Sequence, residues 1–185
     1  HVLRRRQRQM CIRDRTIPGN RALAVHNDIE YKSLNLKIND GNKNIIIASD
    51  LVESFIKENK IEEYKVNFSI KGHELTNTFC KHTLYDSGYN FEVPILHGDF
   101  VTTEQGTGIV HICPVHGMDD FILGKQHDLE LPMTINESGI YYDHIPVFNG
   151  QHIFKVDQNV CDEIKKNNNL ICLLYTSDAA DDEER

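Results

Sequence analysis

Hydrophobic and polar residues alternate along two stretches of this chain. Residues 31–38 (YKSLNLKI) and 64–70 (YKVNFSI) alternate with a period of two, whereas residues 22–25 and 44–49 are short apolar runs. A period of two indicates a strand with one buried face, and short runs of branched apolar residues are typical of buried strands. We therefore predict β-strands at these four places.

The period changes to that of a helix over residues 49–61. Asp50, followed three residues later by Glu53, has the spacing of a capping box at the start of this helix. Four apolar residues share one face of the predicted helix: Leu51, Val52, Phe55 and Ile56. We expect that face to pack against the strands.

Two further segments, residues 117–127 and 157–168, also have helical spacing. In the first segment the apolar positions are Met118, Phe121 and Ile122. In the second they are Val160, Cys161 and Ile164, which we expect to face inward.

Two signals bear on how the strands connect. Lys71-Gly72 predicts a turn, and hence a hairpin that returns through residues 75–84. Pro94, within a short predicted strand at residues 91–96, favours an edge position because proline has no amide hydrogen to donate.

The order of these elements indicates the fold class. Many short strands are interrupted by three scattered helices, without strict alternation of strand and helix. A doubly wound parallel sheet would require that alternation. We therefore predict an α+β fold that resembles a β-barrel, with a few peripheral helices.

The two ends of the chain do not continue this patterning. Residues 1–15 hold six Arg and one Asp, and residues 172–185 are acidic and rich in alanine. A basic run of the first kind can bind nucleic acid. Both ends, however, resemble translated adaptor sequence, and we expect them to be artefacts or disordered. The folded domain is then expected to span residues 16–171.

Without its ends the chain is strongly acidic. Residues 16–171 contain 13 Lys and Arg against 22 Asp and Glu, which is a net charge of −9. Such a surface repels a phosphate backbone, so any contact with nucleic acid must be local and supported by other parts of a larger protein.

Composition bears on the cellular location of the protein and on the redox state of its cysteines. The five cysteines are an odd number without a Cys-x-x-Cys spacing, which indicates reduced thiols rather than a disulfide framework. The chain has neither an apolar run near the roughly 20 residues of a membrane helix nor the apolar segment of a signal peptide. We expect a soluble cytoplasmic protein without a membrane partner.

Candidate chemistry is concentrated in GTGIVHICPVHGMDDF, residues 106–121. His111, Cys113 and His116 could bind a metal, but a zinc site usually needs a fourth ligand and closer spacing. Cys113 could act as a nucleophile with a histidine as its base, yet the sequence names no third group to orient that base. The commoner role of such a cysteine is a small buried apolar residue.

A third interpretation starts from Asp119 and Asp120. Both fall in the first turn of the predicted helix, where unpaired amide groups and the helix dipole stabilise a carboxylate. Consecutive helical positions point about 100° apart, so the two cannot serve the same face. One carboxylate would cap the helix, and the other would look back at the strand that carries His111 and hold an ammonium group. Gly106 and Gly108 would let the backbone approach a ligand, although each could equally mark a bulge.

Three segments resemble a known family: TIPGNRALAVH (16–26), YDSGYNFEVPILHGDFVTTEQGTGIVH (85–111) and PVHGMDDF (114–121). They are similar to the editing domain inserted into the catalytic core of the isoleucyl-tRNA synthetases, within the class I Ile/Val/Leu group. The likeness covers essentially residues 16–171. In the valyl and leucyl enzymes the matching strand usually lacks a counterpart of His111, so the isoleucyl branch is favoured.

The resemblance implies post-transfer editing, the hydrolysis of the valyl ester from the 3′ end of tRNA(Ile). Discrimination by one methylene in an apolar pocket is modest, so a second pocket too small for isoleucine clears the errors. The implied partners are the 3′ end of the aminoacylated tRNA and the remainder of the synthetase, and no metal or cofactor is implied. Two alternatives stay open: a valyl-type domain that clears threonyl-tRNA(Val), and an inactive truncated module that binds RNA.

The resemblance also assigns residues. Asp120 matches the aspartate that anchors the substrate ammonium, and His111 matches the pocket histidine that excludes isoleucine. Thr16 and Asn20 match polar residues that line the substrate site. Asp119 is left with the capping role.

We further expect Gly106, Thr107 and Gly108 to bind the substrate, at the start of the strand that carries His111. A fixed ammonium group would place the ester carbonyl for attack by water. In the family a Thr-Thr-Pro-Trp run precedes TIPGN, whereas CIRDR stands here. This departure removes one wall of the pocket and leaves the activity of the chain by itself an open question.

Overall fold

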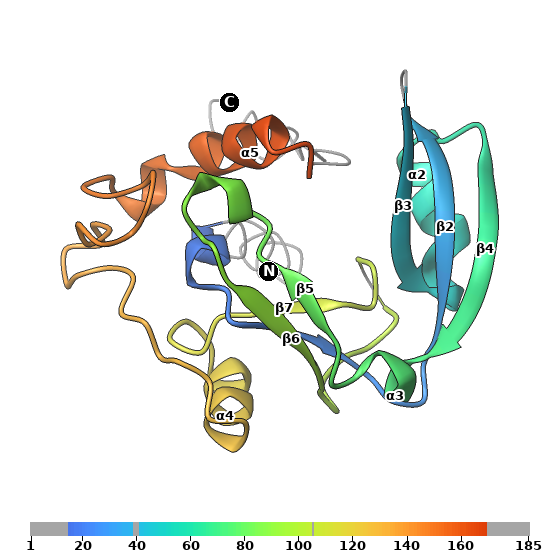
Figure 1. Ribbon diagram of the computed structural model, residues 1–185, viewed down its shortest axis with the longest axis horizontal. Coiled ribbons are helices and arrows are strands. Elements are labelled where there is room, and N and C mark those ends of the chain that lie inside the picture. Colours follow the sequence, from blue (N-terminus) through green and yellow to red (C-terminus); the bar gives the residue numbers. More distant parts are fainter. Residues whose placement is uncertain (1–14, 39–40, 105, 170–185) are drawn as a thin grey trace, which may run out of the picture.

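The computed structural model describes residues 15–38, 41–104 and 106–169. Within these ranges the chain forms two β-sheets with helices around them (Figure 1). Our expectations for residues 1–15 and 172–185 lie outside the described residues, except at Arg15. Among the described helices, none has the length and apolar character needed to cross a membrane.

The first sheet has the strand order β5-β6-β1-β7. Its strands are β1 (Ala22–Val25), β5 (Phe79–Lys81), β6 (Glu92–His97) and β7 (Val110–Ile112). β1 lies between a parallel neighbour, β6, and an antiparallel neighbour, β7. The sheet is therefore built from segments that are far apart along the chain.

The second sheet has the order β3-β2-β4, and its strands follow one another in sequence. They are β2 (Glu30–Ile38), β3 (Gly41–Ala48) and β4 (Tyr64–Lys71), all paired antiparallel. The alternation seen in the sequence places one set of side chains of β2 in the core, since successive residues point to opposite faces. The strands predicted in this region are confirmed, but the expected buried face of β4 is not, since Val66 and Phe68 are 42% and 52% exposed.

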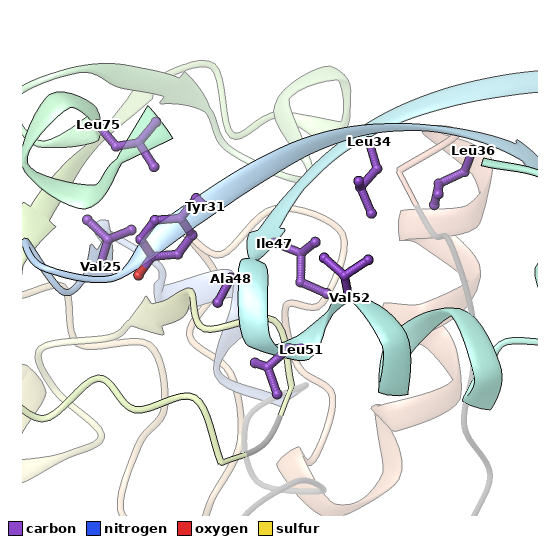
Figure 2. Packing of buried hydrophobic residues seen from close by; sticks show 9 residues of the cluster. All are labelled: Val25, Tyr31, Leu34, Leu36, Ile47, Ala48, Leu51, Val52 and Leu75. Atoms are coloured by element: carbon purple, nitrogen blue, oxygen red, sulfur yellow. The ribbon is translucent and has the colours of Figure 1, made fainter. Parts of the chain in front are cut away.

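The core of the second sheet is apolar. Helix α2 (Val52–Glu58) lies against the sheet, and its Val52 points toward Leu34 of β2 (Figure 2). Phe55 and Ile56 also pack on this cluster, so the apolar helix face predicted from the sequence is confirmed. The buried members of the cluster are Val25, Tyr31, Leu34, Leu36, Ile47, Ala48, Leu51, Val52 and Leu75.

A separate cluster surrounds helix α5 (Asp157–Lys166). Val160 and Cys161 of this helix are buried and Ile164 is partly buried, as predicted. The cluster's buried members are Leu84, Tyr89, Tyr141, Ile145, Phe148, Val156 and Val160. The other described helices are η1 (Ile17–Gly19), η2 (Ser49–Leu51), α3 (Gly72–Leu75), η3 (Tyr85–Ser87), α4 (Met118–Gln126) and η4 (Ile153–Lys155).

The α+β class is confirmed, and in the described residues the two sheets stay separate rather than closing into one barrel. The predicted hairpin after Lys71 is wrong, because α3 follows β4 and the chain then enters the other sheet as β5. Pro94 does not mark an edge, since the short β5 covers the outer side of β6.

The predicted capping box is also wrong, and helix α4 is found where it was predicted but with its apolar positions outward. Residues 49–51 wind into the 3-10 turn η2, so the α-helix begins at Val52 without the predicted capping box. In α4 the apolar positions used to predict the helix are exposed: Met118, Phe121 and Ile122. Its inward side is formed by Leu123 and Gly124, and Gly124 packs closely on Pro114.

Candidate active site

The candidate site is centred on His111, in the middle of β7. Thr16 and Asn20 stand at the two ends of the short turn η1, and both reach this histidine. Thr16 Oγ1 lies 2.7 Å from His111 Nε2, and Asn20 Nδ2 lies 2.9 Å from His111 Nδ1. The structure therefore brings together three of the predicted site residues, although 95 and 91 residues of chain separate the two pairs.

These contacts determine which ring nitrogen of His111 carries the hydrogen. An amide nitrogen only donates, so Asn20 Nδ2 requires His111 Nδ1 to accept. The neutral ring then carries its hydrogen on Nε2, which donates to the Thr16 hydroxyl. With both ring nitrogens engaged, the orientation of His111 is set from two sides.

Asn20 also offers an unused acceptor. Asn20 is 5% exposed, and its side-chain oxygen Oδ1 is buried with no hydrogen-bond partner among the described residues. A buried polar atom left without a partner costs free energy, so such an atom indicates a place for a donor from a ligand. An ammonium or a hydroxyl group would supply that donor.

The carboxylate of Asp120 lies beside Cys113, the residue that follows β7. It belongs to the first turn of α4, and its Oδ2 accepts a hydrogen bond of 3.2 Å from the backbone amide of Cys113. Gly117 leaves room for this carboxylate, because a Cβ at that position would lie 3.1 Å from Asp120 Cγ. The carboxylate thus turns back toward the strand that carries His111.

Asp119 is placed differently from its neighbour. It is exposed, and the N-cap position of α4 belongs to Gly117. A carboxylate in the first turn still interacts favourably with the helix dipole. Asp119 therefore acts on the helix from solvent, whereas Asp120 is directed inward.

The His-x-Cys-x-x-His spacing does not converge on one point. Cys113 is fully buried, and burial raises the pKa of its thiol to about 12, which keeps it protonated and a poor nucleophile. His116 Nε2 lies 2.7 Å from the Thr134 hydroxyl, and burial lowers the pKa of His116. Among the described residues no group of three or more His, Cys, Asp and Glu is arranged to hold a metal ion.

The segment Gly106–Gly108 is held by the second sheet. Both glycines have positive φ, 75° and 70°. Ala48 donates its amide to the Thr107 carbonyl at 2.9 Å, and the Tyr31 hydroxyl donates to the Gly108 carbonyl at 2.8 Å. Gly108 is needed there because a Cβ would lie 2.5 Å from Ala48 Cβ. These three predicted substrate-binding residues are thus placed by the second sheet, ahead of β7.

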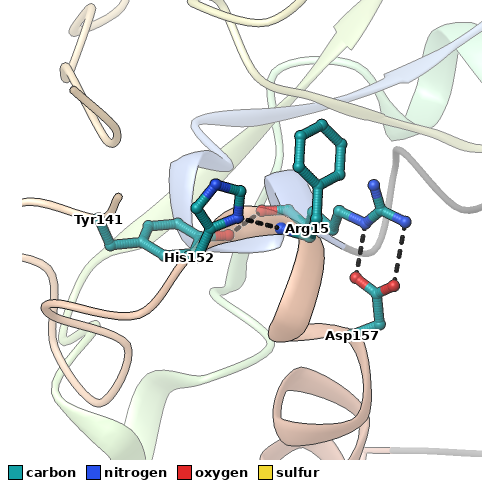
Figure 3. A network of polar contacts seen from close by, with 5 residues as sticks. Arg15, Tyr141, His152 and Asp157 are labelled. Carbon is teal, nitrogen blue, oxygen red and sulfur yellow. Dashed lines mark hydrogen bonds and ion pairs between the residues drawn. The ribbon is translucent and has the colours of Figure 1, made fainter. Parts of the chain in front are cut away.

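Thr16 is anchored from the side of α5. Arg15 forms a two-pronged ion pair with Asp157, with nitrogen–oxygen distances of 2.6 and 3.0 Å (Figure 3). The Tyr141 hydroxyl donates to the Arg15 carbonyl. Next to them, His152 Nδ1 accepts the amide of Phe154. The residue before Thr16 is therefore tied to the α5 cluster.

Sequence reasoning assigned no role to two residues that contact the turn η1. His82 Nε2 lies 3.0 Å from the Ile17 carbonyl, and Arg21 Nη1 lies 2.8 Å from the Asn20 carbonyl. His82 belongs to no recognisable motif, and Arg21 lies in the segment TIPGNRALAVH without having been assigned a role. Only the fold brings His82 to a turn that is 65 residues away in sequence.

Comparison with solved structures identifies the fold. A crystal structure of GlLeuRS-CP1 matches with a TM-score of 0.67 at 17% identity, over 88% of this chain and 81% of that one. The P. knowlesi cytosolic leucyl-tRNA synthetase editing domain matches with a TM-score of 0.60 at 14% identity, over 85% and 80%. The arrangement of elements is therefore that of a synthetase editing domain.

Comparison with curated proteins identifies the relatives. The chain is 40% identical to the isoleucine-tRNA ligase of Pelagibacter ubique over 159 residues, which are 84% of this chain and 18% of that protein. It is 39% identical to the enzyme of Gluconobacter oxydans over 155 residues, 80% of this chain and 16% of that protein. The chain thus spans less than a fifth of the length of these relatives.

No family model matches the chain. The sequence similarity to the ligases and the fold nevertheless agree with the family suggested by the residues around His111. The chain belongs to the isoleucine-tRNA ligase family, where it corresponds to a segment with the editing-domain fold.

Proposed function

We propose that this chain is a post-transfer editing domain that hydrolyses the valyl ester of mischarged tRNA(Ile). The observation that carries the proposal is the fixed imidazole of His111, held by Thr16 and Asn20, together with the carboxylate of Asp120, which bonds the amide of Cys113 two residues further along the chain. This combination offers a charged anchor and a rigid wall, which is what recognition of a small amino acid ester requires.

Asp120 is the proposed anchor. Its carboxylate is half-buried and lies in the first turn of α4, where the helix dipole interacts favourably with a negative charge. An α-ammonium group paired with it would be fixed in position, which places the adjacent ester carbonyl for attack by water. Asn20 Oδ1, which has no partner among the described residues, would accept a second hydrogen bond from the substrate.

His111 is the proposed wall of the pocket. Both of its ring nitrogens are already engaged by Thr16 and Asn20, so the ring has no free lone pair with which to accept a proton from water. A side chain held this rigidly excludes a larger substrate instead of moving aside. Selection of valine over isoleucine would then rest on the fixed position of the imidazole.

The proposed partners are the 3′ end of aminoacylated tRNA(Ile) and the remainder of a synthetase, acting in the cytoplasm. Since residues 16–171 carry a net charge of −9, the domain itself would hold only the terminal nucleotides. The rest of the enzyme would carry most of the contacts with the tRNA backbone.

Hydrolysis of valyl-tRNA(Ile) and isoleucyl-tRNA(Ile), compared side by side, tests the proposal. The protein would be assayed as the full chain and again with the Thr-Thr-Pro-Trp run restored before Thr16. We expect selective loss of the valyl ester. Asp120→Ala should lower the rate about 100-fold or more, since the misplaced carbonyl loses its alignment.

Asp119→Ala is the matched control, because it removes the adjacent carboxylate that faces solvent. It should leave the rate within about twofold if orientation of Asp120 is what matters. Faster hydrolysis of threonyl-tRNA(Val) would point instead to the valyl-type activity. A folded protein that leaves all three esters intact in both forms would contradict the deacylase assignment and favour a module that only binds RNA.

A further inference from the structure

We propose that His82 is a positioning residue for the editing site: it fixes the turn η1, and through this turn it fixes His111. The inference rests on the proposed function of the site, because the wall formed by His111 matters only if a substrate is selected there. His82 itself lies outside the group formed by Thr16, Asn20 and His111, and contacts it through the backbone of Ile17.

The turn η1 acts as a bracket with Thr16 at one end and Asn20 at the other. Within the described residues the Thr16 hydroxyl bonds His111 and does not cap the backbone of its own turn. The amide of Asn20 donates to the Ile17 carbonyl at 3.0 Å, which closes the turn. A 3-10 turn of three residues is weak by itself, so its shape depends on support from outside.

His82 supplies this support at the same carbonyl. Its Nε2 lies 3.0 Å from the Ile17 oxygen, which thereby accepts two hydrogen bonds, one from within the turn and one from His82. The other ring nitrogen, Nδ1, accepts the amide of Leu84 at 3.1 Å. Since Nδ1 accepts, the neutral ring must carry its hydrogen on Nε2 and donate it to Ile17.

The surroundings of His82 hold the ring in that orientation. The residue is 2% exposed, and its ring stacks on Tyr89 with centroids 4.7 Å apart and an interplanar angle of 13°. Phe91 packs against it at 5.0 Å. Burial lowers the pKa of His82 to about 4, so the ring is neutral near pH 7 and keeps the single tautomer that the Ile17 bond requires.

Arg21 holds the opposite end of the bracket. Its Nη1 donates to the Asn20 carbonyl at 2.8 Å, and its guanidinium lies 4.6 Å from the centroid of Phe91. The carbonyls of Ile17 and Asn20 are therefore bonded from one aromatic group, by His82 directly and by Arg21, which lies over Phe91. Displacement of either would move the side chains that grip the two nitrogens of His111.

Two substitutions separate positioning from packing. His82→Phe keeps an aromatic ring against Tyr89 and Phe91 but removes the donor to Ile17, whereas His82→Gln keeps an amide donor and loses the stacked ring. If His82 only fills space, His82→Phe should disturb His111 less than His82→Gln does. If His82 positions the turn, His82→Gln should disturb His111 less than His82→Phe does.

The primary readout is the nitrogen NMR spectrum of the histidine side chains in the full chain, which does not depend on catalysis. In the unaltered protein we expect His82 and His111 each as a single neutral tautomer with hydrogen on Nε2. In His82→Phe the His111 signals should shift and broaden, whereas in His82→Gln they should stay. Tyr89→Phe, which loses only the hydroxyl bond to the Pro146 carbonyl, should leave His111 unchanged and serves as the control for the cluster.

Deacylation of valyl-tRNA(Ile) is the second readout. We expect His82→Phe to lower kcat about 10- to 100-fold with KM within about twofold, because displacement of a positioned group by about 1 Å can cost about 100-fold. If neither the full chain nor the form with the restored Thr-Thr-Pro-Trp run hydrolyses the ester, the proposed function fails, and the NMR comparison still decides the role of His82.

The proposal is overturned if His82 carries its hydrogen on Nδ1 in the unaltered protein, a result that needs no variant to fold. It is also overturned if folded His82→Phe leaves the His111 signals unchanged, or if His82→Gln and Tyr89→Phe disturb them as strongly. The proposal is supported if His82→Phe shifts the His111 signals while His82→Gln and Tyr89→Phe leave them unchanged.

Discussion

The two sheets of this protein are built on different principles. The second sheet, β3-β2-β4, joins consecutive strands and encloses a cluster of apolar side chains. The first sheet joins strands from distant parts of the chain and has an apolar cluster of its own around Ala24, Leu96 and Ile112. Of the buried polar residues that the structure describes, Ser33 belongs to the second sheet and the others lie around the first: Thr16, Asn20, His82 and Thr134. Apolar burial stabilises without direction, whereas buried polar groups must find partners in a defined geometry. The candidate site lies in the region where geometry is specified most strictly.

The two regions meet at the segment Gly106–Gly108. Tyr31 and Ala48, which belong to the apolar cluster, bond the carbonyls of Gly108 and Thr107. The apolar sheet thus provides a firm support for the loop that leads into β7. We expect stability to depend mainly on the second sheet and the orientation of His111 mainly on the first.

The largest effect on stability should come from the apolar cluster. Leu34 is fully buried in β2, and Leu34→Ala should lower the free energy of unfolding by about 2–5 kcal/mol through lost burial and a residual cavity. Urea denaturation measures this loss. The His111 ring signals in NMR should stay where they are, and a large shift would show that the two regions are not separate. Leu131→Ala, at an exposed leucine, should cost less than about 0.5 kcal/mol.

An effect of pH should arise in the first region. The pKa of His82 falls from 6.5 to about 4 on folding, mainly through burial, so below pH 6.5 the unfolded chain binds a proton that the folded chain does not. Stability is therefore complete above pH 6.5 and decreases by about 1.4 kcal/mol per pH unit toward pH 4, or about 3 kcal/mol in all.

Urea denaturation of the unaltered protein and of His82→Phe at pH 7 and pH 4.5 measures this contribution. His116, whose pKa is also lowered by burial, acts in the same direction and is common to both proteins. The unaltered protein should lose more stability than the variant. Equal losses would mean that His82 does not remain neutral in the folded state.

A smaller effect should follow from crowding beneath the turn. A Cβ on Gly19 would lie 2.4 Å from Cys113 Sγ and 3.2 Å from Thr134 Cγ2. Gly19→Ala should therefore cost about 1–3 kcal/mol and displace the turn that grips His111. Thermal unfolding would measure the loss of stability, and the NMR signals of His111 would show the displacement of the turn. Gly41→Ala is the control, because a Cβ there meets nothing within 4 Å; an equal loss from both substitutions would contradict steric crowding.

How far the sequence could be read depended on the range of the interactions. The alternation in β2 and the apolar face of α2 arise from neighbouring residues, and both are confirmed. The hairpin after Lys71 was wrong because a turn signal does not reveal which strand the chain will join next. Exposed Met118, Phe121 and Ile122 show that helical spacing predicts a helix without showing which of its sides is buried.

The sequence by itself determined the local elements and the family, since both depend on short patterns such as the run from Gly106 to Phe121. It also pointed to Asp120 and His111 as the chemistry of the site, which stays a prediction. Only the tertiary structure decided that Thr16 and Asn20 grip both nitrogens of one imidazole and that His82 bonds the turn between them. The physical reason is that hydrogen bonds between residues 65 to 95 positions apart leave no periodic pattern along the chain.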